Sequence, residues 1–239
     1  MGAALIEPAH AQRFGARLRA WYRRNARDLP WRKTRDPYEI LVSELMLQQT
    51  QVARVLEYWP RFLDRFPTLE SLSAARETQV VRAWAGLGYY ARARNLHKLS
   101  RWVTRDGDGA LPREPAALRE LPGIGAYTAG AVASFAHEHR AALVDTNVAR
   151  VLSRVFAPRL NPKRARDLTR IWRIAESTLP RTGRATWTQN QALMELGALV
   201  CTARVKRCPA CPVRTECRTF AKDQKAAKRT EPKGKRRAE

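Results

Sequence analysis

The sequence predicts an all-α protein, and two observations lead to that prediction. Apolar residues recur at three- and four-residue spacing through most of the chain, and no stretch alternates convincingly as a strand would. Breakers rich in proline and glycine separate the periodic segments. The helices expected on this basis span residues 14–22, 38–50, 52–66, 78–87, 91–103, 116–121, 128–136, 148–156, 165–178 and 190–200.

Composition bounds the size of the core and the class of partner. The chain has 239 residues, 44% of them hydrophobic, which is enough for one or two compact lobes. Its net charge of +23 works against compactness, and its usual purpose is to meet a phosphate backbone. The alternative is a basic solubility tail. However, residues 218–239 hold nine Lys/Arg and three acidic residues, so they contribute only +6 of that charge.

Three further features of the sequence concern membrane spans, secretion and the C-terminal segment. No apolar run approaches the roughly 20 residues of a membrane span. The N-terminus lacks the basic start and apolar core of a secretory signal, so we expect a cytoplasmic, nucleoid-associated protein with no membrane partner. From residue 223 onward the chain is Lys-rich and almost free of apolar residues, which predicts a disordered, solvated arm.

All four cysteines lie close together near the end of the chain. Cys201, Cys208, Cys211 and Cys217 are separated by six, two and five residues. In a reducing compartment such a cluster predicts a metal site rather than disulfides. Four thiolates suit either a tetrahedral zinc ion or an iron–sulfur cube. Structural zinc sites more often use two CxxC pairs, and the single pair here favours the cube.

Residues 121–130, LPGIGAYTAG, predict a helix, a tight turn and a second helix. Gly123 and Gly125 both allow positive φ and the close approach of another backbone. The free amides that open the second helix, with the helix dipole behind them, form a ready anion site. An ordinary helix–helix turn is the alternative, but the full run is far more specific than a lone GxG.

Two carboxylates stand in unusual places. Asp145 precedes a predicted helix where an N-cap belongs, and capping is its simplest role. Glu44 lies in the apolar helical stretch 40–47, so we expect partial burial, which raises a carboxyl pKa and can keep the group protonated. A salt-bridged Glu44 without a catalytic task is the alternative. One protonated and one ionised carboxyl group are what glycosidic hydrolysis requires.

Together these motifs resemble the catalytic part of the MutY-type adenine DNA glycosylases, in the superfamily of endonuclease III. The resemblance runs from about residue 23 to 217 and includes DLPWR at 28–32, LQQTQV at 47–52, GLGYYARARNL at 86–96 and NQALMELG at 190–197. The cysteine spacing resembles the [4Fe–4S] loop of that superfamily. Because the chain ends at residue 239, we expect it to lack the C-terminal 8-oxoguanine-recognition domain usual in the family.

The resemblance implies a two-lobed helix–hairpin–helix DNA glycosylase fold with a [4Fe–4S] cluster loop. Residues 29–137 would form a six-helix barrel that carries the hairpin. Residues 138–222 would form the cluster lobe and pack with an N-terminal helix in 1–28, and 223–239 would be the basic disordered tail. A mispaired base of double-stranded DNA would flip into the cleft between the lobes of a monomer.

Roles for individual residues follow from the same resemblance. Glu44 would protonate the purine at N7, Asp145 would stabilise the oxocarbenium-like sugar, and Tyr127 and Asn147 would orient these carboxylates. The base pocket would be lined by Arg27, Trp31, Leu47 and Glu195. Contacts to DNA would come from the wedge Gln48, Gln49 and Thr50, from an intercalating Tyr89 or Tyr90, and from the hairpin residues Gly123, Gly125 and Thr128.

Departures from the family pattern leave alternatives open. Bifunctional relatives carry Lys where this chain has Tyr127, so we expect a monofunctional enzyme that hydrolyses the N-glycosidic bond of adenine opposite guanine or 8-oxoguanine. Thr146 stands where the adenine enzymes usually have Gly. Short mismatch glycosylases that remove thymine or uracil opposite guanine share Tyr at this position and the TRDPY run at 34–38. A non-enzymatic iron–sulfur DNA-binding protein would not need both Glu44 and Asp145.

Overall fold

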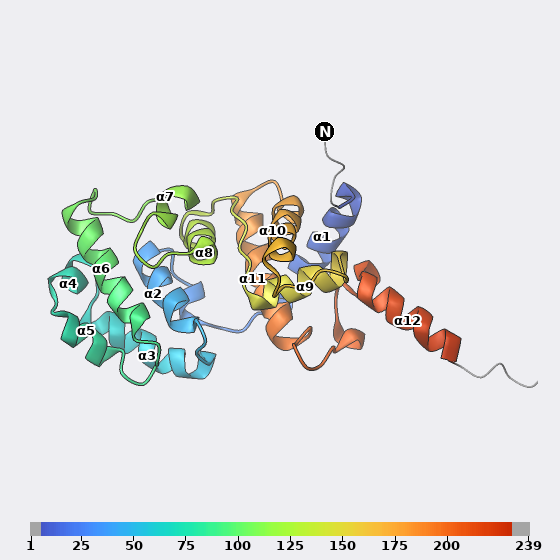
Figure 1. The fold of residues 1–239 in the computed structure, drawn as a ribbon, viewed down its shortest axis with the longest axis horizontal. Helices are drawn as coiled ribbons and strands as arrows, with labels where there is room; N and C mark the ends of the chain where they lie inside the picture. Colours follow the sequence, from blue (N-terminus) through green and yellow to red (C-terminus); the bar gives the residue numbers. More distant parts are fainter. Residues whose placement is uncertain (1–5, 231–239) are drawn as a thin grey trace, which may run out of the picture. The chain divides into compact units, whose positions relative to one another are not determined.

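The computed structural model describes residues 6–230, and over that range the chain is helical, as the sequence predicts. The described part contains no strand beyond an isolated antiparallel bridge between Cys201 and Lys206. The α-helices are α1 (Pro8–Asn25), α2 (Pro37–Leu47), α3 (Val52–Arg65), α4 (Leu69–Ala74), α5 (Glu77–Ala83), α6 (Ala91–Arg105), α7 (Pro115–Arg119), α8 (Ala126–His137), α9 (Thr146–Phe156), α10 (Ala165–Thr178), α11 (Gly183–Leu199) and α12 (Arg218–Thr230) (Figure 1).

The chain divides into two compact units. Residues 27–143 and 181–187 form one, here called the hairpin unit. The described residues of 1–26, 144–180 and 188–239 form the other, here called the cluster unit. This division differs from the expected 29–137 and 138–222 in three ways: the hairpin unit begins at residue 27, its first segment ends at residue 143, and residues 181–187 join it.

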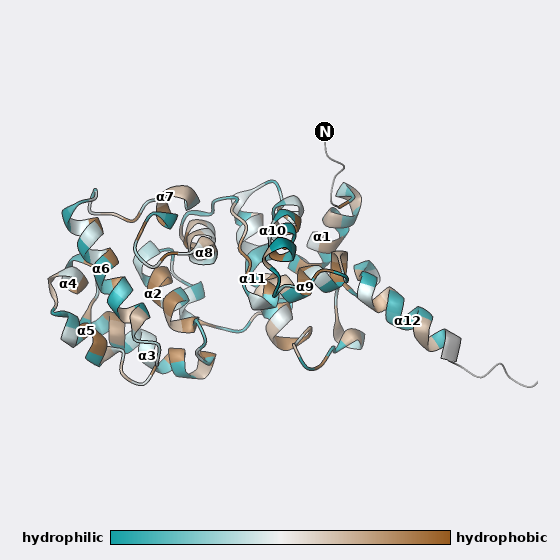
Figure 2. Ribbon diagram, viewed as in Figure 1, coloured by the Kyte–Doolittle hydropathy of each residue, from teal (hydrophilic) through white to brown (hydrophobic). Residues whose placement is uncertain are grey.

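In the hairpin unit, α2 is the central helix. Asp36 caps it by accepting hydrogen bonds from the Tyr38 and Glu39 amides at 2.7 and 3.2 Å, and Pro37 occupies its first turn. Apolar residues cover most of its ribbon, and every residue from Ile40 to Met46 is buried (Figure 2). Such a helix is stable only inside a core.

Helix α8 packs against α2 with small side chains. Ala129, Ala131 and Ala133 are fully buried. Elsewhere on α8, a Cβ at Gly130 would collide with the Ala142 carbonyl oxygen, so only glycine permits the close approach of the segment that follows this helix. The close α2–α8 packing fixes the spacing between Glu44 and Tyr127, which these two helices carry.

The cluster unit has an aromatic centre. Phe14 of α1 meets Phe156 of α9 edge-on, with ring centroids 4.9 Å apart. The buried side chain of Glu216 lies near Arg13 and Arg17 of α1 at 3.2 and 3.5 Å and so ties the cysteine segment to that helix. The cysteine segment is thus anchored to the core of its own unit.

The prediction of a disordered arm from residue 223 is wrong for residues 223–230, which continue α12. Alanine, lysine and glutamine dominate this stretch, and all three are strong helix formers. Lys206 also forms an ion pair with Asp223 at 2.6 Å, which holds the first turns beside the cysteine segment. Residues 231–239 of the predicted arm lie outside the described residues.

Candidate active site and cysteine pocket

Glu44 lies on α2 with only 4% of its surface exposed, so the expected burial is confirmed. The hydroxyl group of Tyr127, in the first turn of α8, donates a hydrogen bond to Glu44 Oε2 at 2.7 Å. Within the hairpin unit, two of the predicted site residues are therefore in direct contact. The hydrogen bond fixes the orientation of the Glu44 carboxyl group.

The hairpin consists of α7, the turn 120–125 and α8. Gly123 has φ +78°, so the positive φ expected there is confirmed. A Cβ at Gly123 would lie 2.7 Å from Asn95 Cβ, so the close neighbour is a side chain and not the backbone that the sequence argument expected. Gly125 differs. It caps α8 at φ −91°, and a Cβ there would meet nothing within 4 Å. Gly125 therefore does not use the positive φ that glycine allows, and nothing approaches it closely; the position where its Cβ would lie, at the N-terminus of α8, is open space.

The predicted helix 38–50 ends early, at Leu47, because the backbone turns at the next residues. Residues 48–50, here called the wedge turn, place Gln49 at φ +56°, a left-handed conformation that non-glycine residues seldom adopt. Gln48 Nε2 donates to Thr128 Oγ1 of α8 at 3.4 Å. This bond connects the wedge turn to the hairpin.

Residues 86–90 form a second irregular segment, here called the aromatic loop. Its Tyr89 has φ +48° and is 59% exposed, and Tyr90 is 40% exposed. A groove is lined jointly by Gln48, Gln49, Tyr89, Tyr90 and Arg94, among others. The structure therefore brings the predicted wedge and the predicted intercalating tyrosines onto one surface of the hairpin unit.

In the cluster unit, Asp145 caps α9 as the sequence predicts. Its Oδ1 accepts from the Val148 amide at 2.7 Å, and its Oδ2 accepts from Asn147 Nδ2 at 2.9 Å. The Asn147 Oδ1 accepts in turn from Arg150 Nη2 at 2.7 Å. Both carboxylate oxygens thus have fixed donors, and the carboxylate is held at the N-terminus of a helix, where negative charge is favoured.

Arg150 is a site residue that the sequence argument missed. Its Nη2 also donates to the Gly197 carbonyl at 2.8 Å, and its Nε donates to the Cys201 carbonyl at 2.8 Å. The spacing offered a signal, because Asn147 and Arg150 lie three residues apart and share a helix face. One side chain therefore connects the Asp145 partner to the first cysteine.

The predicted base-pocket residues divide between the units. Arg27, Trp31 and Leu47 belong to the hairpin unit, where Trp31 is buried and meets Trp59 edge-on at 6.1 Å. Glu195 belongs to the cluster unit, where it is fully buried on α11. The role of Glu195 in a base pocket therefore stays a prediction.

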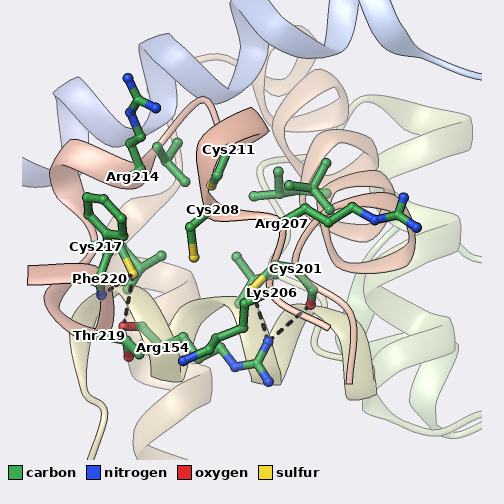
Figure 3. Close-up of a pocket in the computed structure, with 15 residues that line it drawn as sticks. Arg154, Cys201, Lys206, Arg207, Cys208, Cys211, Arg214, Cys217, Thr219 and Phe220 are labelled. Atoms are coloured by element: carbon green, nitrogen blue, oxygen red, sulfur yellow. Dashed lines mark hydrogen bonds between the residues drawn. The ribbon is translucent and has the colours of Figure 1, made fainter. Parts of the chain in front are cut away.

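The four cysteines line one pocket, and their sulfur atoms face a common space (Figure 3). Arg154 Nη1 donates to the Cys201 sulfur at 3.2 Å, and the Phe220 amide donates to the Cys217 sulfur at 3.5 Å. The apolar residues of the lining include Val151, Leu196 and Val213. The spacing argument, which rests on sequence alone, therefore corresponds to a real convergence of thiols.

The donor set can be tested against a metal group. Burial raises the pKa of the Cys211 thiol to about 11 and also raises the pKa of Cys217. Thiolates gathered in such a pocket need metal cations to balance their charge. Within residues 6–230 the side chains do not form a ready three-ligand site for a single ion. Four converging thiols are the donor set that either a tetrahedral zinc ion or an iron–sulfur cube requires.

No helix within residues 6–230 is long and apolar enough to cross a membrane. The described surface is instead rich in exposed cations, which suits the polyanionic partner expected from the net charge of +23.

The α7–turn–α8 hairpin, the buried Glu44 and the four-thiol pocket define a helix–hairpin–helix protein of the endonuclease III type. A model of the "HhH-GPD superfamily base excision DNA repair protein" matches residues 42–174, more than half of the chain. The chain therefore belongs to the HhH-GPD superfamily of base excision DNA repair proteins.

Relatives in sequence are adenine DNA glycosylases. The chain is 46% identical to that of Mycobacterium tuberculosis over 200 residues, 82% of this chain and 64% of the relative. It is 40% identical to that of Mus musculus over 221 residues, 89% of this chain and 42% of the relative. The predicted relationship to this family is confirmed, and the chain spans between two fifths and two thirds of these relatives.

Among solved structures, a thermostable thymine-DNA glycosylase superimposes with a TM-score of 0.81 at 30% identity, covering 90% of this chain and 98% of that one. A non-covalent endonuclease III–DNA complex superimposes with a TM-score of 0.75 at 23% identity, covering 92% and 99%. The expected helix–hairpin–helix glycosylase fold is confirmed.

Proposed function

We propose that this chain is a monofunctional adenine DNA glycosylase, which hydrolyses the N-glycosidic bond of adenine mispaired with guanine or 8-oxoguanine in double-stranded DNA. The observation that carries the proposal is the 2.7 Å hydrogen bond from Tyr127 to the buried Glu44. This hydrogen bond orients a carboxyl group at a buried position, where a residue with only a structural role would be apolar. Identity of 46% to an adenine DNA glycosylase supports adenine as the base.

Glu44 would act as the general acid. Burial disfavours the ionised form of a carboxyl group, and a protonated carboxyl can donate. Because Oε2 accepts the Tyr127 hydrogen bond, the transferable proton would sit on Oε1. Its transfer to N7 of adenine gives the base a positive charge and lets it accept the electron pair of the breaking C1′–N9 bond.

Asp145 would stabilise the sugar cation. As the C1′–N9 bond breaks, positive charge develops on the sugar ring, and a fixed carboxylate lowers the energy of that state. The hydrogen bonds from Val148 and Asn147 hold the Asp145 oxygens in place, so little reorganisation is needed. Water then adds to C1′ and gives its proton to the Glu44 carboxylate, which restores the acid.

Tyr127 supports the assignment as monofunctional. Bifunctional relatives use a lysine amine at this position, and a phenol cannot form an imine with the abasic sugar. The product would therefore be an intact strand with an abasic site. Borohydride should trap no covalent protein–DNA adduct.

Two surfaces of the hairpin unit would bind the DNA. The open space in front of Gly125 and the α8 amides would take a phosphate. The wedge turn and the aromatic loop, which share a groove, would fill the gap left by the extruded base and separate its neighbours. Phosphate contacts of this kind fix the position of the protein on the duplex without reading its sequence.

The four cysteines would hold a [4Fe–4S] cluster. The convergence of the four thiols on one pocket supports this, together with the spacing of six, two and five residues between the cysteines. The bound cluster supplies cross-links that pin the basic segment 201–217. Two arginines also hold the first cysteine in place: Arg154 donates to the Cys201 sulfur, and Arg150 connects the Cys201 carbonyl to Asn147.

A second function has a specific observation in its favour. The thermostable thymine-DNA glycosylase matches this fold with a TM-score of 0.81 over nearly its whole length. The alternative function of the same site is therefore the removal of thymine opposite guanine. Its lower identity of 30%, against 46% for an adenine enzyme, favours adenine.

The test is a panel of single-turnover reactions on duplexes that contain A·8-oxoguanine, A·G, G·T and G·U pairs. We expect adenine release from the first two and intact strands until alkali is added. Thymine or uracil release without adenine release would replace the adenine assignment with the alternative. Release of no base from any duplex would overturn both.

A further inference from the structure

Arg92 is a buried cation that no catalytic step employs. It lies in the first turn of α6, and only 8% of its surface is exposed. Its five N–H groups face seven acceptors, of which six are backbone carbonyls. These acceptors are the carbonyls of Leu45, Met46, Gln48, Leu87, Gly88 and Tyr89, and the hydroxyl of Thr50.

The first group of acceptors ends the helix that carries Glu44. Arg92 Nη1 donates to the Leu45 and Met46 carbonyls at 2.6 and 3.0 Å, and to the Gln48 carbonyl at 2.6 Å. The last carbonyls of a helix lack helical partners and lie at the negative end of its dipole. The guanidinium thus caps α2 where the wedge turn begins.

The second group belongs to the aromatic loop. Arg92 Nη2 donates to the Leu87 and Gly88 carbonyls at 3.1 and 3.0 Å, and also to Thr50 Oγ1 of the wedge turn at 3.3 Å. One side chain therefore connects two segments that lie almost forty residues apart in the sequence. Its guanidinium also lies 5.5 Å from the ring centroid of Tyr89, the exposed aromatic residue.

Both segments contain backbone that needs such support. Gln49 at φ +56° and Tyr89 at φ +48° are two of the three non-glycine residues with positive φ among the described residues. Each left-handed residue raises the energy of its segment, and it persists only where the surroundings determine it. Within residues 6–230 no carboxylate forms an ion pair with Arg92, so the carbonyl oxygens of these two turns provide its counter-charge.

We propose that Arg92 is a positioning residue, which locks the wedge turn and the aromatic loop into one preformed surface for separating stacked bases. The inference rests on the proposed function, because it gives this surface the task of opening a duplex. Arg92 also lines the groove, but it is only 8% exposed and its donors are directed to acceptors of the protein. It would act through the backbone of Gln48, Gly88 and Tyr89, and the side chains of Gln48 and Tyr89 line the common groove.

The variants follow from the donor count. Arg92→Met keeps an unbranched side chain and removes all five donors, whereas Arg92→Lys keeps the charge and three donors but loses the planar fork. The matched control is Lys98→Met, which removes one exposed positive charge from the same helix. Circular dichroism and the unfolding midpoint establish the folded fraction of each protein, and rates are normalised to it.

Two duplexes distinguish a positioning role of Arg92 from a merely structural one. One duplex pairs the target adenine with guanine, and the other places it opposite an abasic-site analogue, where less pairing and stacking must be broken. A 2-aminopurine beside the target reports unstacking without any need for excision. We expect Arg92→Met to lower excision from the paired duplex about tenfold or more, and to reduce the fluorescence rise, because buried hydrogen bonds to a charge are among the strong ones.

On the abasic-partner duplex, Arg92→Met should stay within about threefold of the wild type, since less of the barrier there is base extrusion. Arg92→Lys should fall between Arg92→Met and the wild type on the paired duplex, and Lys98→Met should match the wild type on both. Equal loss on both duplexes would make Arg92 a structural residue and overturn the inference, as would unchanged excision and fluorescence. If the wild type unstacks the 2-aminopurine but releases no base, the proposed excision fails, and the fluorescence alone decides the inference: a smaller rise with Arg92→Met supports it, and an unchanged rise overturns it.

Discussion

Asp145 caps α9 in the structure and is proposed to act in catalysis, and two substitutions separate the cap from the proposed role. Its Oδ1 caps α9 through the Val148 amide at 2.7 Å, and the carboxylate as a whole carries the charge assigned to catalysis. Asp145→Ser keeps an oxygen that can cap the helix, because serine is as good an N-cap as aspartate. Asp145→Ala removes both the cap and the charge.

The magnitudes follow from these contacts. Loss of the cap in Asp145→Ala should lower the free energy of unfolding by about 1 kcal/mol, which for a chain of this size lowers the Tm by roughly 2–4 °C. Asp145→Ser should stay close to the wild type in urea denaturation. Both variants should lose at least about a hundredfold in single-turnover excision, the scale expected for a removed charge stabiliser.

The comparison of stability with rate makes this prediction sharp. If Asp145 were only a cap, Asp145→Ser would excise at nearly the wild-type rate, and Asp145→Ala would lose activity only in proportion to its unfolded fraction. That result would refute the catalytic role. Equal Kd values for duplex DNA across the three proteins would show that the lost rate is not lost binding.

Three other predictions concern the hairpin, the acid and the cysteines. Gly123→Ala should lower the free energy of unfolding by at least about 1 kcal/mol, because φ is +78° there and a Cβ would meet the Asn95 side chain. Gly125→Ala should fold normally but bind duplex DNA more weakly, as measured by fluorescence anisotropy. Equal stability and equal DNA affinity of the two variants would contradict the difference assigned to these glycines. Tyr127→Phe should lower excision about tenfold by removing the 2.7 Å hydrogen bond to Glu44, and an unchanged rate would remove Tyr127 from the site. Purified protein should hold about four irons per chain and absorb broadly in the visible range, and stoichiometric zinc without iron would contradict the cluster; Cys211→Ser should lower the yield of folded protein more than the activity of what survives.

Much of the fold could be predicted from the sequence because its helices are long and strongly periodic. The Asp36–Pro37 breaker became the start of α2, and Asp145 became the cap of α9, as the local residue types require. The short α4 was missed. Its signal is a capping box between Thr68 and Ser71, which marks the start of a helix even where six residues are too few to show a period.

Other features could not be predicted because they depend on contacts distant in sequence. The helix expected to reach residue 50 ends at Leu47, where Arg92 supplies the cap from another helix. The difference between Gly123 and Gly125 depends on Asn95, which approaches only the first of them. In the same way, no local pattern in α9 reveals that Arg150 reaches the Cys201 carbonyl.

The α12 helix shows a different limit. A Lys-rich segment with few apolar residues predicts disorder, because it has little surface to bury. In this structure the segment is nevertheless helical through residue 230, with residues of high helix propensity and an ion pair between Lys206 and Asp223. Composition alone does not reveal a contact that orders one end of such a segment.

The central claim is that Glu44 is the acid that releases adenine, and one measurement tests it most directly. Single-turnover excision is compared for wild type and Glu44→Gln on a duplex with adenine opposite 8-oxoguanine. Glutamine keeps the shape and can still accept the Tyr127 hydrogen bond, so folding and duplex affinity should be retained. We predict that the wild type releases adenine and that Glu44→Gln is slower by at least about a hundredfold. Adenine release by Glu44→Gln at the wild-type rate would contradict the account.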